Sequence, residues 1–143
     1  ITEDNSLYKA YSYRNTEEFI ENLFSVDIRY DLTIDCVVSQ DGFRDFFLRR
    51  ALLENHILRH NKSLKFFIET NEVPKPYEIY WKVRNVGRIA EQKNQTRGQI
   101  VHTDLDHQKE KTSFRGPHFV ECYIVKNKVC VARARIDVPI GEC

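Results

Sequence analysis

Apolar and polar residues alternate in several short segments of the chain, as they do in strands that bury one face. The alternation is clearest over residues 77–85, which place Tyr77, Ile79, Trp81 and Val83 on one face and Glu78, Tyr80, Lys82 and Arg84 on the other. Alternating or apolar runs over 31–38, 64–69 and 97–102 predict further strands. Residues 88–96 are interpreted as a polar connection with a helical turn, and 104–109 as a charged loop.

Two longer apolar runs, 118–125 and 129–138, flank Asn127-Lys128 and predict a β-hairpin with a tight turn. In the simplest register Tyr123 faces Ala132 and Cys122 faces Arg133. One face is then polar or mixed, with His118, Val120, Cys122, Arg133 and Arg135. The other face is mostly apolar but includes Glu121. We expect an arginine to pair with Glu121, because burial of an unpaired carboxylate is costly.

Helical spacing of apolar residues occurs in the first part of the chain. A cap residue and an acidic first turn at 15–18 precede Phe19, Ile20, Leu23 and Phe24, which predicts a helix. Residues 42–60 predict the longest helix. We therefore expect an α+β protein in which an N-terminal helical segment precedes a mainly antiparallel β-sheet or small β-sandwich. Residues 1–63 are assigned to a helical lead-in with one strand, and residues 64–143 to a β-rich domain.

The composition fits one globular domain of 143 residues, because 41% of them are hydrophobic. The 22 Lys and Arg nearly balance the 21 Asp and Glu, so the overall charge does not favour nonspecific binding to DNA or to an anionic membrane. We expect neither a membrane nor sequence-specific DNA as a partner. No apolar run approaches the roughly 20 residues of a membrane span. The chain begins at Ile1 and has no Met, so we expect it to be part of a longer protein. The four cysteines lack C-x-x-C spacing, which favours reduced thiols in a cytoplasmic protein without a metal site or cofactor.

No motif of nucleophilic or metal-dependent catalysis is present: there is no Gly-rich phosphate loop, no G-x-S-x-G and no H-E-x-x-H. His118 and Cys122 lie roughly 13 Å apart along one strand, too far for a direct catalytic pair. We expect this chain to be non-catalytic.

A binding site is favoured instead, because a compact sheet would bring together cations from separate predicted elements: Lys82, Arg84, Arg97, Arg115, Arg133 and Arg135. Arginine forks suit phosphate oxygens, and Tyr80, Trp81, Phe114 and Tyr123 offer rings on which a base can stack. Thr112 and Arg115 belong to a loop over 110–116 that we expect to face a ligand, and His118 to face the arginines. The alternative is that the arginines form structural pairs, for example Arg84 or Arg97 with Glu121.

Three spaced motifs carry a family resemblance: Tyr80-Trp81-Lys82-Val83-Arg84-Asn85-x-Gly87, then Arg97-Gly98-x-Ile100, then Glu110-x-Thr112-x-Phe114-x-Gly116-x-His118-x-Val120-Glu121-Cys122-Tyr123. Over residues 64–140 the chain thereby resembles the adenylyl/guanylyl cyclase and SMODS C-terminal sensor domain. The resemblance implies a module that senses a nucleotide or cyclic oligonucleotide in bacterial anti-phage signalling. It also implies a covalently linked nucleotidyltransferase or effector domain upstream.

Charge pattern and resemblance together give two sets of candidate residues. The expected ligand contacts are Trp81, Lys82, Arg84, Arg97, Thr112, Phe114, Arg115, His118, Arg133 and Arg135. The expected structural positions are Asn85, Gly87, Gly98, Gly116 and Glu121. Two other functions stay open: a regulatory protein-interaction module without a small ligand, and a module that binds single-stranded nucleic acid.

Overall fold

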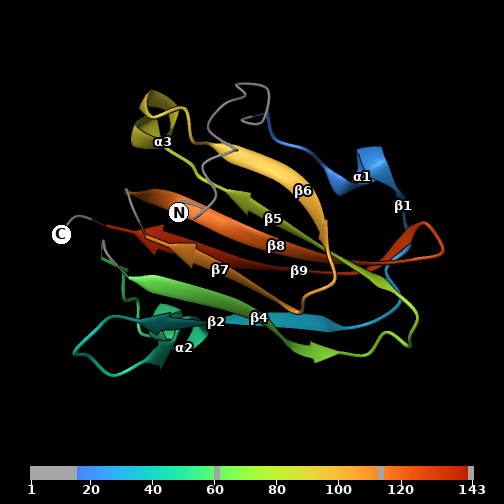
Figure 1. The fold of residues 1–143 in the computed structure, drawn as a ribbon, viewed down its shortest axis with the longest axis horizontal. Helices are drawn as coiled ribbons and strands as arrows, with labels where there is room; N and C mark the ends of the chain where they lie inside the picture. Colours follow the sequence, from blue (N-terminus) through green and yellow to red (C-terminus); the bar gives the residue numbers. More distant parts are fainter. Residues whose placement is uncertain (1–15, 60–61, 113–114, 142–143) are drawn as a thin grey trace.

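Two β-sheets packed face to face make up the computed structural model, which describes residues 16–59, 62–112 and 115–141 (Figure 1). The five-stranded sheet has the order β1 (Ser25–Val26), β9 (Val129–Ile140), β8 (Gly116–Lys126), β5 (Glu78–Arg84) and β6 (Arg97–Thr103). The four-stranded sheet has the order β3 (Phe46–Phe47), β2 (Leu32–Ser39), β4 (Ser63–Asn71) and β7 (His107–Lys111). All pairs are antiparallel except β1 with β9, so the mainly antiparallel sandwich is confirmed.

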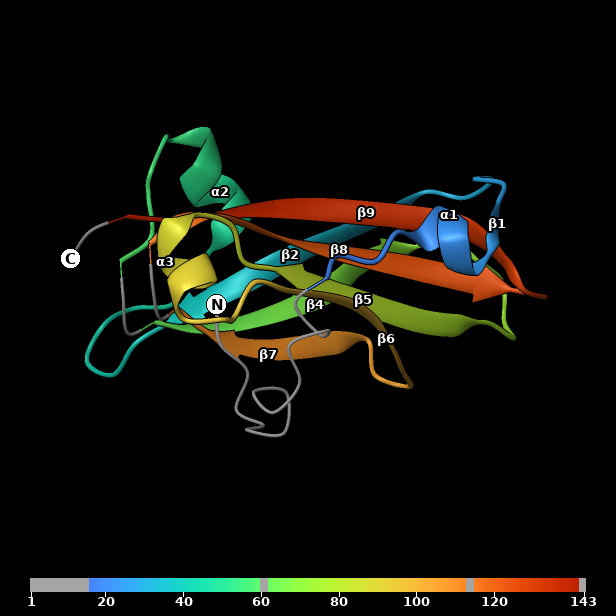
Figure 2. The ribbon, with the colours of Figure 1, turned by 90° about the horizontal axis from the view of Figure 1, so that it is seen from above.

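Helices are short in the described part of the chain: α1 (Ile20–Leu23), α2 (Leu48–Leu53) and α3 (Arg88–Gln92). The α+β expectation is therefore confirmed only in part, because strands dominate the fold. Figure 2 shows α2 and α3 near one end of the sandwich and α1 with β1 near the other. The division of the chain at residue 64 stays a prediction. Strands from both sides of that point pair, β2 with β4 and β1 with β9.

The core lies between the sheets and follows the alternation in the sequence. The β2 residues predicted to share a face, Leu32, Ile34, Cys36 and Val38, are all buried. Ile79, Trp81 and Val83 of β5 meet them from the other sheet, as the pattern predicts. The alternation of apolar and polar residues in these strands thus identifies their buried faces correctly.

The long helix predicted over 42–60 is wrong. Phe46 and Phe47 form β3 and pair with β2, and only Leu48–Leu53 is helical. Asn55 adopts a positive φ of 58° directly after the C-cap, which ends the helix as Asn often does. The apolar spacing was misleading here because aromatic residues of an edge strand and of a helix give similar short patterns.

The charged loop predicted over 104–109 is also wrong, because His107–Lys111 forms the edge strand β7. Its Lys109 and Lys111 side chains are exposed, whereas Glu110 between them is buried. Charged residues are typical of edge strands, where they prevent pairing with other chains. The high charge of this segment therefore conceals a strand.

The hairpin and its turn are confirmed, with Asn127 and Lys128 both at positive φ as a type I′ turn requires. The predicted register is wrong by one residue, because a β-bulge lies between Ile124 and Val125.

The shift exchanges the two faces of β8. Glu121 lies opposite Arg135 and Tyr123 lies opposite Arg133 in the strand register. These four residues are on the face that points away from the four-stranded sheet. His118, Val120 and Cys122 lie on the opposite face, and Val120 and Cys122 belong to the core between the sheets.

Residues 16–24, hereafter the strap, cross the outer face of the five-stranded sheet. The Glu18 N–H donates to the Gly98 carbonyl at 2.9 Å. Ile20 is fully buried in a small outer cluster with Tyr123, Val125 and Cys130. In Figure 1 α1 lies on the side of β5 and β6, away from β2 and β4.

Candidate ligand-binding site

Four of the predicted cations share the outer face of the five-stranded sheet. Residues that lie opposite each other on neighbouring strands share one face of the sheet. Lys82 of β5 lies opposite Glu121 of β8, and Glu121 lies opposite Arg135 of β9. Arg133, opposite Tyr123, and Arg84, opposite Phe119, lie on the same face. The structure thus brings Lys82, Arg84, Arg133 and Arg135 together on one face, although they come from separate strands, β5 and β9.

Lys82 is almost completely buried in this face, with 2% of its surface exposed. Its Nζ lies 2.9 Å from a carboxylate oxygen of Glu17 and 3.1 Å from one of Glu121. It also donates to the Glu18 carbonyl at 2.9 Å, and it lies over the Phe19 ring. A buried ammonium group requires such partners, since its desolvation is otherwise costly. Lys82 therefore joins the strap to the sheet.

Arg133 forms a second junction between the sheet and the strap. Its Nη1 donates to Glu21 at 2.8 Å, and its Nη2 lies 3.8 Å from Glu121. The hydrogen bond from Arg133 lowers the pKa of Glu21 below the ordinary value. The Tyr123 hydroxyl donates to Glu121 at 2.9 Å, and burial raises the pKa of Tyr123. Glu121 is thus paired as expected, by Lys82 and Arg133.

Arg84 and Arg135 have contacts within the same face. The Arg84 Nη1 donates to the Arg97 carbonyl at 2.7 Å, and its Nε lies 3.7 Å from Glu17. The Arg135 guanidinium stacks on the Phe119 ring, 3.8 Å from its centroid, and lies 3.2 Å from Asp137. Each cation of this face therefore has a protein partner.

Arg97 and Thr112 connect different parts of the chain instead. Arg97 pairs at 2.5 Å with Glu110, whose side chain is fully buried, and so links β6 to β7 of the other sheet. The Thr112 hydroxyl donates to the Arg59 carbonyl at 2.9 Å and accepts from the Lys62 N–H at 2.8 Å. In this structure both predicted ligand contacts hold the sandwich together.

Trp81 and His118 are buried and do not reach a surface on which a base could stack. The Trp81 indole N–H donates to the Leu105 carbonyl at 3.3 Å. The His118 Nδ1 accepts from the Val86 N–H at 2.8 Å, so this nitrogen carries no proton. The expectation that His118 faces the arginines is wrong, because the register shift places it on the other face of β8. Phe114 lies outside the described residues.

Three of the expected structural positions, Asn85, Gly87 and Gly98, lie in the connection between β5 and β6 or at the start of β6. The Asn85 side chain donates to the Gln95 carbonyl at 2.7 Å, and its N–H donates to the Thr96 carbonyl at 2.8 Å. Gly98 has a φ of 121°, and a Cβ at this position would lie 2.9 Å from the Cα of Glu17. A side chain at residue 98 is therefore incompatible with the present position of the strap.

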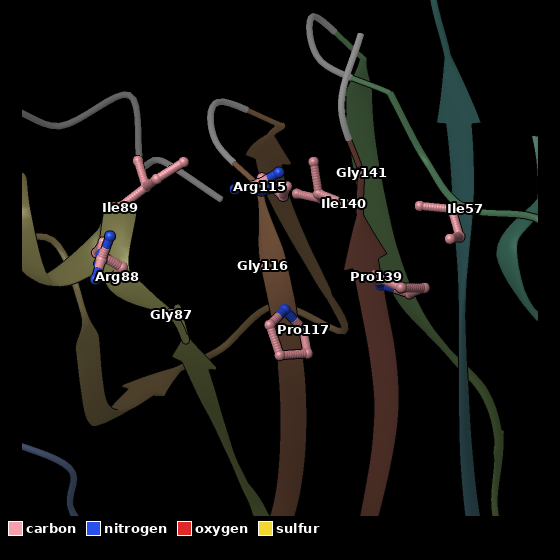
Figure 3. Close-up of a pocket in the computed structure, with 10 residues that line it drawn as sticks. All are labelled: Ile57, Gly87, Arg88, Ile89, Arg115, Gly116, Pro117, Pro139, Ile140 and Gly141. Carbon is pink, nitrogen blue, oxygen red and sulfur yellow. The ribbon is translucent and has the colours of Figure 1, made fainter.

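Arg115 lies elsewhere, at an open pocket of about 450 Å³ near one end of the sandwich (Figure 3). This end pocket is lined by Ile57, Gly87, Arg88, Ile89, Arg115, Gly116, Pro117, Pro139, Ile140 and Gly141. In Figure 3 Arg115 and Ile140 lie side by side, with Ile57 on one side and Arg88 with Ile89 on the other. Two arginines, Arg88 and Arg115, thus lie among mainly apolar residues in the lining of the pocket.

Sequence reasoning identified only part of this pocket. Arg115 was expected to contact ligand, and Gly87 and Gly116 to have structural roles. A Cβ at Gly116 would lie 2.0 Å from the Val86 carbonyl oxygen, so the close approach of these two segments requires glycine. Arg88 and Ile57 were missed, although Arg88 directly follows the Asn85-x-Gly87 motif.

Comparison with known families explains why these motifs occur together. The family model of the adenylyl/guanylyl and SMODS C-terminal sensor domain matches residues 14–141. The chain belongs to this family. The match begins well before residue 64, so this sensor domain includes the strap and the four-stranded sheet as well as the three motifs. No curated protein matches the chain.

Two of the cysteines in the described part of the sensor domain are buried in the core. Burial raises the pKa of Cys36 and of Cys122, which disfavours the nucleophilic thiolate. Within residues 16–59, 62–112 and 115–141, no group of three or more His, Cys, Asp or Glu is placed to hold a metal ion. Over the same ranges no helix is long and apolar enough to span a bilayer.

Proposed function

We propose that this sensor domain binds a nucleotide second messenger, such as a cyclic oligonucleotide, in the end pocket. One observation carries the proposal: Arg115, expected from the sequence to contact ligand, lies with Arg88 at an opening of about 450 Å³. Ligand pockets have volumes of about 300–1,000 Å³, so a nucleotide of moderate size fits this range.

The chemistry of the pocket suits a phosphorylated ligand with an apolar part. Arginine forks bind phosphate oxygens through paired, charge-assisted hydrogen bonds. Ile57, Ile140 and Pro139 form a wall against which the flat face of a base or the ring of a ribose can pack. The backbone at Gly87 and Gly116 allows close approach, because these residues have no side chain.

The proposal extends to a wider role. As part of the proposal, the domain acts by binding and carries no catalysis itself. It serves bacterial anti-phage signalling in the cytoplasm and regulates a linked nucleotidyltransferase or effector domain. The description of the family as a C-terminal sensor supports this arrangement.

Calorimetric titration with cyclic di- and trinucleotides tests the proposal. We expect Arg115→Ala and Arg88→Ala each to weaken binding about ten- to hundredfold, since a hydrogen bond to a charged group contributes about 1.5–3 kcal/mol. Arg29→Ala is the matched control, because Arg29 is exposed, pairs with Asp27 and hydrogen-bonds near the opposite end of β9. No binding of any nucleotide at high micromolar concentration would overturn the proposal, as would equal affinities of Arg115→Ala and the control.

An exposed apolar surface favours the second candidate function, a regulatory module that binds a protein and no small ligand. Phe43 and Phe47, near or in β3, and Leu53 and Ile57, in or after α2, are each more than half exposed. If this candidate is correct, Leu53→Glu will abolish regulation of the linked domain, and no nucleotide will bind in the titration.

A further inference from the structure

The strap places its carboxylates where the phosphates of a ligand would bind. Glu17 lies 2.9 Å from Lys82 and 3.7 Å from Arg84, and Glu21 lies 2.8 Å from Arg133. These cations come from β5 and β9, which both pair with β8 in the five-stranded sheet. The outer face thus forms a prepared anion site that the chain itself occupies.

The charge of the outer face depends on the strap. On the sheet, the cations Lys82, Arg84, Arg133 and Arg135 outnumber the carboxylates of Glu78, Glu121 and Asp137. The strap adds the carboxylates of Glu17, Glu18 and Glu21, which reverses the excess. Removal of the strap therefore changes this surface from acidic to basic, and a basic surface attracts phosphate groups.

Polar contacts hold most of the strap. The Glu18 side chain accepts from the Ile100 N–H at 2.7 Å, in addition to the backbone hydrogen bond to Gly98. Among the apolar residues of the strap, Ile20 is fully buried and Phe24 packs edge-on against the Tyr80 ring, whereas Phe19 is 49% and Leu23 46% exposed. The helix within it has four residues, too few to be stable without these contacts. An anion that pairs with the same cations can therefore compete with the strap.

We infer that the outer face is a second binding site, for a small ligand with two or more phosphates, and that the ligand and the strap occupy it in turn. Lys82, Arg84 and Arg133 pair with phosphate oxygens in place of Glu17 and Glu21. This inference does not depend on the end pocket.

Neutralising the strap provides the first test, with the 143-residue chain and inorganic triphosphate as the probe. Glu17→Gln/Glu21→Gln removes the competing charge, so we expect it to bind triphosphate about tenfold more tightly than wild type, equivalent to about 1.4 kcal/mol. The control Glu69→Gln/Glu72→Gln makes the same change in net charge on β4 and the residue next to it, and should match wild type. Equal affinities of the two double variants would overturn the inference.

Hydrogen exchange provides the second test. Saturating triphosphate should speed exchange of the Glu18 and Ile100 amides in wild type, because both lose strap contacts. Slower exchange of these amides on binding would contradict the inference. Cyclic diadenylate in place of triphosphate shows whether a nucleotide supplies the phosphates. If a single-stranded oligonucleotide releases the strap and neither small probe does so, the assignment to a small ligand is overturned.

Separate variants distinguish this site from the end pocket. Arg133→Gln, at a half-exposed position, should remove the gain in triphosphate affinity from Glu17→Gln/Glu21→Gln. Arg115→Ala should leave that gain unchanged. If Arg115→Ala removes it instead, triphosphate binds in the end pocket and the second site is refuted.

Discussion

The end pocket and the strap-covered face both hold cations, but in different surroundings. At the outer face Lys82 and Arg133 are paired with carboxylates of the chain itself, at distances of 2.8–3.8 Å. At the pocket Arg88 and Arg115 lie exposed beside apolar walls and glycine backbone. At the outer face, pairing with carboxylates couples Lys82 and Arg133 to the stability of the strap, whereas Arg88 and Arg115 are the proposed ligand contacts of the end pocket. Proximity of arginines alone does not separate these roles.

The largest effect should distinguish the two regions by stability. Lys82→Met leaves Glu17 and Glu121 without their shared ammonium group, so we expect the free energy of unfolding to fall by about 3–5 kcal/mol. Arg115→Ala, at an exposed position, should change it by less than about 0.5 kcal/mol. Urea denaturation followed by circular dichroism measures both. Similar losses in the two variants would remove the distinction between the regions.

A smaller effect should be confined to the strap. Gly98→Ala places a Cβ 2.9 Å from the Glu17 Cα at a φ of 121°, so we expect a local cost of about 1–3 kcal/mol and faster exchange of the Glu18 amide. Gly42→Ala is the matched control, because Gly42 also has a positive φ but no atom lies within 4 Å of the added Cβ. Nucleotide affinity of the end pocket should stay unchanged in both variants. Equal exchange of the strap in the two variants would contradict the close contact at Gly98.

The smallest effect should depend on pH. Arg133 lowers the pKa of Glu21 in the folded state, so this pair stabilises the strap at pH values above the ordinary glutamate pKa of 4.5. The stabilisation is lost as the pH falls through the lowered pKa of Glu21. Exchange of strap amides, corrected for intrinsic rates, should therefore rise on acidification and rise less in Glu21→Gln. Because Glu21 is largely exposed, the effect is small. The same pH dependence in wild type and Glu21→Gln would exclude this pair as its source.

The sequence predicts the sandwich better than it predicts the site. Alternation identifies the buried faces of β2 and β5, because each strand has one face on the core. It does not identify the outer network, because Glu17 and Lys82 are distant in sequence and meet only through tertiary packing. The bulge at Ile124 is a second obstacle: one extra residue reverses the faces of β8, and with them the position of His118. The end pocket was missed in part because Ile57 and Arg88 come from segments without a shared motif.

A nucleotide bound in the end pocket should protect the backbone amides that line it. Hydrogen exchange on the wild-type chain, with and without the cyclic di- or trinucleotide that binds most tightly in the titration, measures this protection. We predict slower exchange over 87–89, 115–117 and 139–141, the segments that line the pocket with Ile57. Protection elsewhere in the chain, with no change in these three segments, would contradict binding in the end pocket.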